Sequence, residues 1–151
     1  MTVSNPSFVF SLERVREVRA HEEDRAREAF AASLSVRARG LALLADARAR
    51  SEAARAQAAT KSTPRTGAEL IAAQAWLERV QRSEHQAAVE VDRSETDLEQ
   101  RRAALTAAGQ RRHALERLKD RQREAHRIQA GRREAGILDE MALNGYLRRA
   151  S

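Results

Sequence analysis

Four histidines are the side chains in this sequence best suited to bind a metal ion. A zinc site on a helix needs two histidines four residues apart with an acidic neighbour. His21, His85, His113 and His126 are spread along the chain and form no such pair. The glycines are isolated within helical sequence, so they form no phosphate-binding loop. We therefore expect no metal site, no cofactor and no enzymatic activity.

Basic side chains gather between Arg111 and Arg133, a stretch with nine basic and three acidic residues and hence a net charge of +6. Such a segment can contact an acidic protein surface, a membrane or nucleic acid, or it can simply keep a helix solvated. It contains no aromatic residue that could stack on bases, and its acidic residues would repel phosphates. We therefore expect a protein partner and no nucleic acid, with a solvated helix face as the alternative.

The elements that carry this charge must be helices. Of the 151 residues, 42% are hydrophobic and about half of these are alanine, whereas only 3% are aromatic. Alanine favours helix but removes little apolar surface from water, so it can fill thin contacts between helices and not a thick core. The chain has no cysteine, no apolar run of about 20 residues and no signal peptide pattern, which predicts a soluble cytoplasmic protein.

One stretch, from Thr60 to Thr66, interrupts the helical pattern. Pro64 disfavours helix at the residue before it, and Thr66 with Glu69 forms a capping box that restarts the helix. The whole chain, residues 1–151, is therefore predicted to be one all-α domain, a long antiparallel two-helix coiled-coil hairpin. The predicted bounds are about 10–59 for helix one, about 60–66 for the turn and about 67–143 for helix two.

Helix two has the clearest heptad spacing. Two positions of each heptad face the partner helix in a coiled coil, and we call the line of such side chains the contact row of a helix. The predicted contact row of helix two consists of Leu70, Leu77, Val91, Leu98 and Leu105 in one phase and Ala73, Val80, Ala87, Ala108 and Leu115 in the other.

Helix one could start at Asn5-Pro6 or at Ser11, since either could cap it. Its predicted contact row consists of Val15, Ala26, Phe30, Leu34, Leu41 and Leu44, with Arg19, Glu22 and Arg37 at intervening positions. The four-residue steps from Ala26 to Phe30 to Leu34 depart from a heptad and predict a locally relaxed supercoil.

Folding the chain about Ser62 to Pro64 places Leu12 opposite about Leu115. Residues beyond about Leu118 then have no partner helix and are predicted to form a C-terminal single-helix overhang that carries the basic stretch. At ~1.5 Å per residue, helix two would be on the order of 110 Å long.

Four segments in order resemble one known family. They are Phe8–Arg16 (FVFSLERVR), Trp76–Val80 (WLERV), Leu115–Gln122 (LERLKDRQ) and Leu138–Ala142 (LDEMA). Their order and spacing, over nearly the whole chain, resemble those of the flagellar type III export protein FliJ family.

The resemblance implies a non-enzymatic coiled coil similar to the central stalk of rotary ATPases. Such a protein binds and stimulates the hexameric export ATPase FliI, and it contacts the export gate FlhA and export chaperones. The implied location is cytoplasmic, peripheral at the inner face of the cell membrane at the flagellar base. The equivalent stalk of an injectisome and an unrelated structural coiled-coil adaptor stay open as alternatives.

The resemblance also implies two sets of contact residues. The ATPase-facing set is Arg117, Lys119, Arg121, Arg123 and Arg127. The gate-facing set is Leu44, Ala47, Ser51, Trp76, Val80, Ser83 and Ala87. The chain departs from the family pattern where aromatic residues are expected near Ala47 and Ser51, and where a histidine is expected near Ala87. Since Leu77 belongs to the contact row, Trp76 is expected beside that row as an exposed anchor for a partner.

Overall fold

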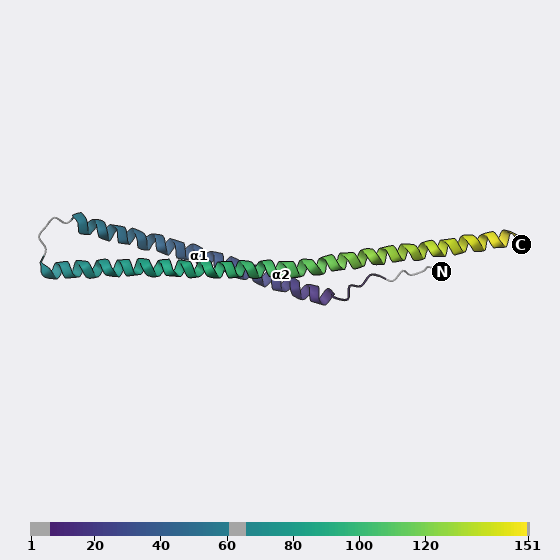
Figure 1. The fold of residues 1–151 in the computed structure, drawn as a ribbon, viewed down its shortest axis with the longest axis horizontal. Helices are drawn as coiled ribbons and strands as arrows, with labels where there is room; N and C mark the ends of the chain where they lie inside the picture. Colours follow the sequence, from purple (N-terminus) through teal and green to yellow (C-terminus); the bar gives the residue numbers. More distant parts are fainter. Residues whose placement is uncertain (1–6, 61–65, 151) are drawn as a thin grey trace. The chain divides into compact units, whose positions relative to one another are not determined.

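Two long helices account for the regular structure of the chain. The computed structural model describes residues 7–60 and 66–150, and both regular elements in these residues are α-helices. Helix α1 is Glu13–Thr60 and helix α2 is Gly67–Ala150 (Figure 1). The predicted all-α hairpin, with two long helices packed against each other, is confirmed.

The start of α2 has the predicted capping box. The Thr66 amide donates to Glu69 Oε2 at 2.8 Å, and the Glu69 amide donates to Thr66 Oγ1 at 3.3 Å. This exchange satisfies two amides that have no partner within the helix. Most of the predicted turn, including Pro64, lies outside the described residues.

The other helix ends differ slightly from the expected ones. Residues 7–10 are not helical, and α1 begins at Glu13, whose amide donates to the Phe10 carbonyl oxygen at 3.1 Å. The alternative start at Asn5-Pro6 lies outside the described residues. Helix α2 runs to Ala150 and does not end near residue 143, because nothing there breaks the helix and the arginines of its last turn suit the negative end of the helix dipole.

The packing of the chain divides it into two compact units. The hairpin unit is Asp24–Ala107, and the terminal unit combines Met1–Glu23 with Ala108–Ser151. Each unit contains one stretch of α1 and one stretch of α2.

In the hairpin unit, the contact row of α1 consists mainly of small side chains. Its most buried members are Ser33, Leu44, Ala47, Ser51 and Ala54. Gly40 lies on the same row, where an added Cβ would come 3.5 Å from Val91 Cγ2 of α2. The row alternates steps of three and four residues, which is the spacing of a heptad. The predicted step from Phe30 to Leu34 is therefore wrong, because the row passes from the half-buried Phe30 to Ser33, three residues later.

Leu34 and Leu41 were expected in this row, but they are 44% and 39% exposed. Each follows directly after a small residue, Ser33 or Gly40, that occupies the row instead. Small side chains let two helix backbones approach closely, and the heptad phase that continues through Leu44 selects those positions. The two leucines consequently lie at the edge of the contact.

The contact row of α2 in the hairpin unit largely follows the prediction. Val80 and Val91 are buried and Leu77, Leu98 and Leu105 are half-buried, whereas Leu70 at the start of α2 is exposed.

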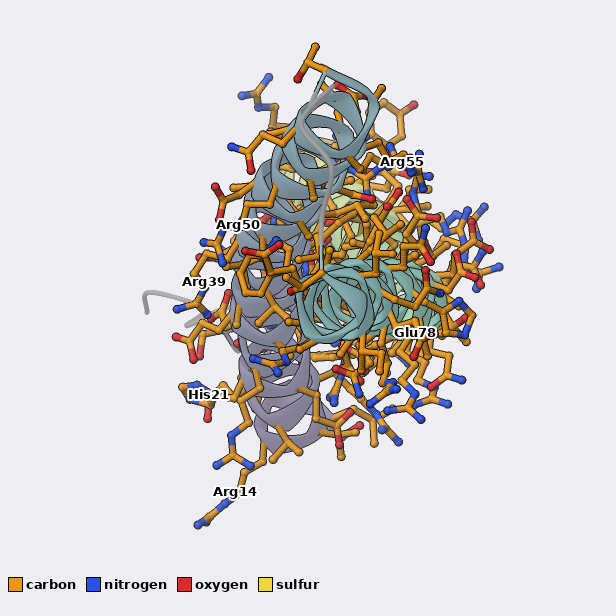
Figure 2. The ribbon with its side chains drawn as sticks, turned by 90° about the vertical axis from the view of Figure 1, so that its left-hand side faces the viewer. Arg14, His21, Arg39, Arg50, Arg55 and Glu78 are labelled. Atoms are coloured by element: carbon orange, nitrogen blue, oxygen red, sulfur yellow. The ribbon has the colours of Figure 1, made fainter. Side chains whose placement is uncertain are left out.

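Among the described residues of the hairpin unit, two ion pairs join the helices. They are Arg37–Glu95 at 3.1 Å and Arg55–Glu84 at 3.9 Å. Because the later residue of α1 pairs with the earlier residue of α2, the two stretches run antiparallel. Other charged side chains, such as Arg39 and Glu78, project outward into solvent (Figure 2).

In the terminal unit, the contact between α1 and α2 contains charged side chains as well as apolar ones such as Ala108. Glu23 is only 8% exposed and accepts a hydrogen bond from Arg112. Lys119 Nζ donates to Glu13 Oε2 at 2.7 Å. Helix pairing ends there because α1 begins at Glu13, in agreement with the predicted end of the partner helix. Val15, expected in the contact row, is exposed.

The residues before α1 also pack against α2, beyond the point where α1 begins. Phe10 is 5% exposed, and Lys119 Nζ lies 5.9 Å from the centroid of its ring. The ring of Phe8 lies 5.8 Å from that of His126. The exposed part of α2 therefore begins about two turns later than predicted, and the side chains of residues 127–149 are mostly exposed. Two phenylalanines outside any helix replace the missing partner helix over the intervening turns.

Candidate interaction sites

Trp76 lies beside the contact row of α2, as the heptad phase predicts. It comes directly before the half-buried Leu77 and one turn before the buried Val80. Its side chain is 51% exposed, so the indole has one face against the hairpin and another in solvent. The expected exposure is confirmed, and its role as an anchor for a partner stays a prediction.

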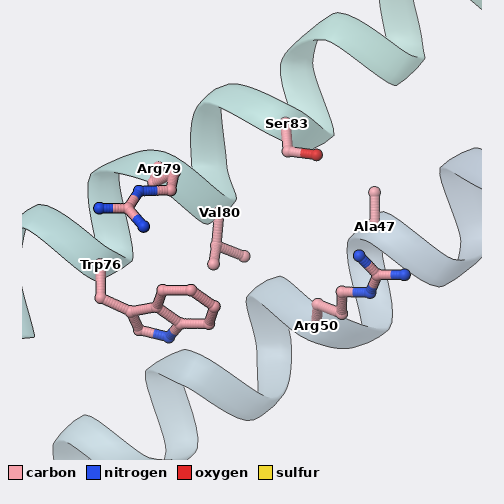
Figure 3. Close-up of a pocket in the computed structure, with 6 residues that line it drawn as sticks. All are labelled: Ala47, Arg50, Trp76, Arg79, Val80 and Ser83. Atoms are coloured by element: carbon pink, nitrogen blue, oxygen red, sulfur yellow. The ribbon is translucent and has the colours of Figure 1, made fainter.

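A cleft of about 170 Å³ opens next to this tryptophan in the hairpin unit. Its lining consists of Ala47 and Arg50 from α1 and Trp76, Arg79, Val80 and Ser83 from α2. Trp76 and Val80 point from α2 toward α1, whereas Arg50 lies over α1 beside Ala47 (Figure 3). The small side chain of Ala47 fills little of this space.

The cleft combines an apolar wall with positive charge. The Arg79 guanidinium lies 5.9 Å from the centroid of the Trp76 ring, within the range of a cation–π contact. Arg50 forms an ion pair with Asp46 one turn earlier. An indole face beside two guanidinium groups suits a partner segment that presents an apolar side chain next to a carboxylate.

The cleft brings together four of the seven residues of the predicted gate-facing set. Trp76 and Ser83 are exposed, whereas Ala47 and Val80 are buried at its base. The other three do not line it: Leu44 and Ser51 are buried in the contact row, and Ala87 is half-buried. Most of the set therefore lies between the helices, where a partner reaches it only if the hairpin opens.

Two residues of the cleft, Arg50 and Arg79, were missed by the sequence analysis. Arg79 could have been found, because it follows Trp76 by three residues and so lies on the same helix face. Arg50 could not, because its place in the same cleft as Trp76 depends on the register between α1 and α2.

The predicted ATPase-facing set lies in the terminal unit and divides into three groups. Arg117 and Arg121 are exposed, four residues apart on one face of α2. Arg127 is exposed but donates two hydrogen bonds to Glu124, at 2.7 and 2.8 Å. Lys119 and Arg123 contact the residues before α1, through Phe10 and Phe8 respectively.

Hydrogen-bonded ion pairs lower the pKa of two carboxyl groups in this unit. Hydrogen bonds from Arg16 and Lys119 lower the pKa of Glu13 from its ordinary value of 4.5 to about 2. The hydrogen bonds from Arg127 likewise lower the pKa of Glu124. Both carboxylates are therefore charged at neutral pH, and each offsets part of the positive charge of the basic stretch.

The family comparison covers nearly the whole chain. Residues 8–151 match the family model described as flagellar FliJ protein. The chain belongs to the flagellar FliJ family. No match was found among curated proteins or among solved structures. Membership in the FliJ family confirms the resemblance and makes this a protein related to flagellar export.

In residues 7–60 and 66–150, no helix is long and apolar enough to cross a bilayer. Within the same ranges, the acidic and histidine side chains form no group of three that could hold a metal ion.

Proposed function

We propose that this FliJ-family chain is a stalk-like, non-enzymatic component of the flagellar export apparatus that binds and stimulates the export ATPase FliI. It would also link the ATPase to the export gate FlhA and to export chaperones. Its place would be cytoplasmic, peripheral to the inner face of the cell membrane at the flagellar base. The matched family is flagellar, which favours the flagellar system over an injectisome.

The observation that carries the ATPase contact is the pair Arg117 and Arg121. Both are exposed on a continuous helix, with no ion-pair partner among the described residues. Open guanidinium groups on a rigid element can form bidentate pairs with carboxylates of a partner and raise its association rate. Arg127 would contribute less to the ATPase contact because it already forms an ion pair with Glu124.

A charge reversal on α2 tests the ATPase contact. We expect Arg117→Glu with Arg121→Glu to weaken binding to purified FliI on the order of tenfold and to reduce its stimulation of ATP hydrolysis. The matched control is Arg82→Glu with Arg102→Glu, which makes the same charge change at exposed positions of α2 in the hairpin unit. Equal stimulation by both variants would show that the basic face serves only solubility.

The gate contact is proposed to use the cleft beside Trp76. Trp76 and Ser83 would touch the gate directly, and Arg50 and Arg79 would attract its acidic groups. The buried members of the gate-facing set, such as Leu44, would act by keeping the cleft in shape.

Replacing the tryptophan tests the gate contact. We expect Trp76→Ala to weaken binding to the FlhA cytoplasmic domain by about 2 kcal/mol or more, because half-exposed tryptophans are frequent interface hot spots. Ile71→Ala is the control, since Ile71 is an exposed apolar residue of α2 outside the cleft. A large loss of thermal stability with unchanged affinity would assign Trp76 to the hairpin alone.

A further inference from the structure

The residues just before α1 cover part of the basic stretch with aromatic side chains. Phe8 and Phe10, two residues apart in a non-helical segment, both contact α2, whereas Val9 between them is 80% exposed. This alternation is that of an extended segment lying along a helix with every second side chain toward it. We call residues 8–10 the strap.

The aromatic rings of the strap contact cationic side chains of α2. Lys119 Nζ lies 5.9 Å from the Phe10 ring, and the Arg123 guanidinium lies 6.0 Å from the Phe8 ring. The Phe8 ring also packs at 5.8 Å against the ring of His126. The side chain of Lys119 is only 23% exposed and also pairs with Glu13, so little of its charge faces solvent.

These contacts divide the ATPase-facing set by whether its members already interact with the strap. Arg117 and Arg121 are open to a partner, whereas Lys119 and Arg123 already interact with the strap. A partner that uses the whole set must compete with Phe8 and Phe10. The strap contacts α2 through two side chains and is not part of a helix, so its local opening should cost less than separation of the helices.

We propose that the strap is an autoinhibitory segment that a protein partner with an acidic surface displaces from α2, which uncovers Lys119 and releases the already exposed Arg123 from the Phe8 ring. The proposal rests on the ATPase contact proposed above. An acidic surface fits because, without the strap, Lys119 and Arg123 could pair with it beside the two arginines that are already open. The apparent affinity of the partner is then reduced in proportion to the fraction of molecules in which the strap is displaced.

Removing the aromatic side chains tests the proposal. We expect Phe8→Ala with Phe10→Ala to bind the export ATPase several-fold more tightly than the parent, because the competing segment is lost. Val9→Ala is the matched control, since Val9 points away from α2, and it should bind like the parent. Affinity of the double variant equal to or weaker than that of the parent would overturn the proposal.

A reversible crosslink tests the same idea without deleting the strap. The chain has no cysteine, so Phe8→Cys with His126→Cys can be joined selectively by a reducible bismaleimide. We expect several-fold weaker binding of the ATPase to the crosslinked form and recovery after reduction. Equal affinity before and after reduction would contradict the proposal.

The two proposals fail in different ways. If the ATPase contact is wrong, Arg117→Glu with Arg121→Glu binds like the parent, whatever the strap does. If only the strap proposal is wrong, that charge reversal still weakens binding, while the strap variants and both crosslink states bind like the parent.

Discussion

The hairpin unit and the terminal unit use the same two helices but hold them together differently. In the hairpin unit, small and aliphatic side chains such as Leu44, Ala47 and Val91 form the contact, with ion pairs at its edges. In the terminal unit, the contact contains Glu23 and Arg112, and aromatic side chains cover the next turns of α2.

Because of this difference, the stability of the two units should respond to different conditions. Apolar contacts respond to the loss of buried volume and little to salt or pH. Hydrogen-bonded ion pairs respond to protonation and screening. The terminal unit, which also carries the proposed ATPase contact, should therefore open more readily than the hairpin unit when the solvent changes.

The largest expected effect comes from breaking the apolar contact of the hairpin unit. Leu44→Ala should lower the free energy of unfolding by about 2 kcal/mol or more, because Leu44 is 6% exposed and its loss leaves a void. Leu43→Ala is the matched control, since the neighbouring Leu43 is 66% exposed and should cost less than about 0.5 kcal/mol. Urea unfolding followed by circular dichroism measures both, and equal losses would contradict the heptad phase described for α1.

A smaller and more local effect should follow from breaking the polar contact of the terminal unit. Glu23→Gln removes the charge that Arg112 binds in a buried position, so amide exchange should become faster in the terminal unit and stay unchanged in the hairpin unit. Glu28→Gln, at an exposed position of α1, is the control. Hydrogen exchange measured by mass spectrometry separates the two units, and equal changes in both would contradict the difference between them.

Acid should weaken the terminal unit through Glu13. The pKa of Glu13 is lower in the folded protein than its ordinary value of 4.5, so its contribution is fully present above that value. The contribution is lost as the pH falls from 4.5 toward about 2. Glu13→Gln should remove this part of the acid sensitivity, and the exposed Glu99→Gln should retain it. Exchange rates of the terminal unit across this pH range measure the effect, and identical profiles for the two variants would disprove it.

The smallest effect is expected at Ser51, which is 1% exposed and whose hydroxyl has no hydrogen-bond partner among the described residues. Ser51→Ala should raise the free energy of unfolding by up to about 1 kcal/mol, because it removes a buried unpaired polar group. Ser35→Ala, at an exposed position of α1, corrects for the higher helix propensity of alanine. A loss of stability in Ser51→Ala beyond that control would show that the hydroxyl contributes to the contact.

Much of the fold could be predicted because it depends on local chemistry. The capping box of Thr66 and Glu69 involves residues three apart, and the heptad phase of α2 is marked by large aliphatic residues such as Leu77 and Leu98. The exposure of Trp76 followed from that phase. The contact row of α1 was harder to predict, because a glycine and serines occupy positions where the sequence offers leucines one residue further on.

The sequence by itself determined that the chain is helical, where α2 begins and which face of α2 meets α1. Only the tertiary structure decided that Ser33 and Gly40 lie between the helices, that Arg50 lines the same cleft as Trp76 and that Phe8 contacts Arg123. The physical reason is the range of the interactions. Helix formation and capping depend on residues within four positions of one another, whereas these contacts join residues far apart in the chain and depend on how closely the helices approach.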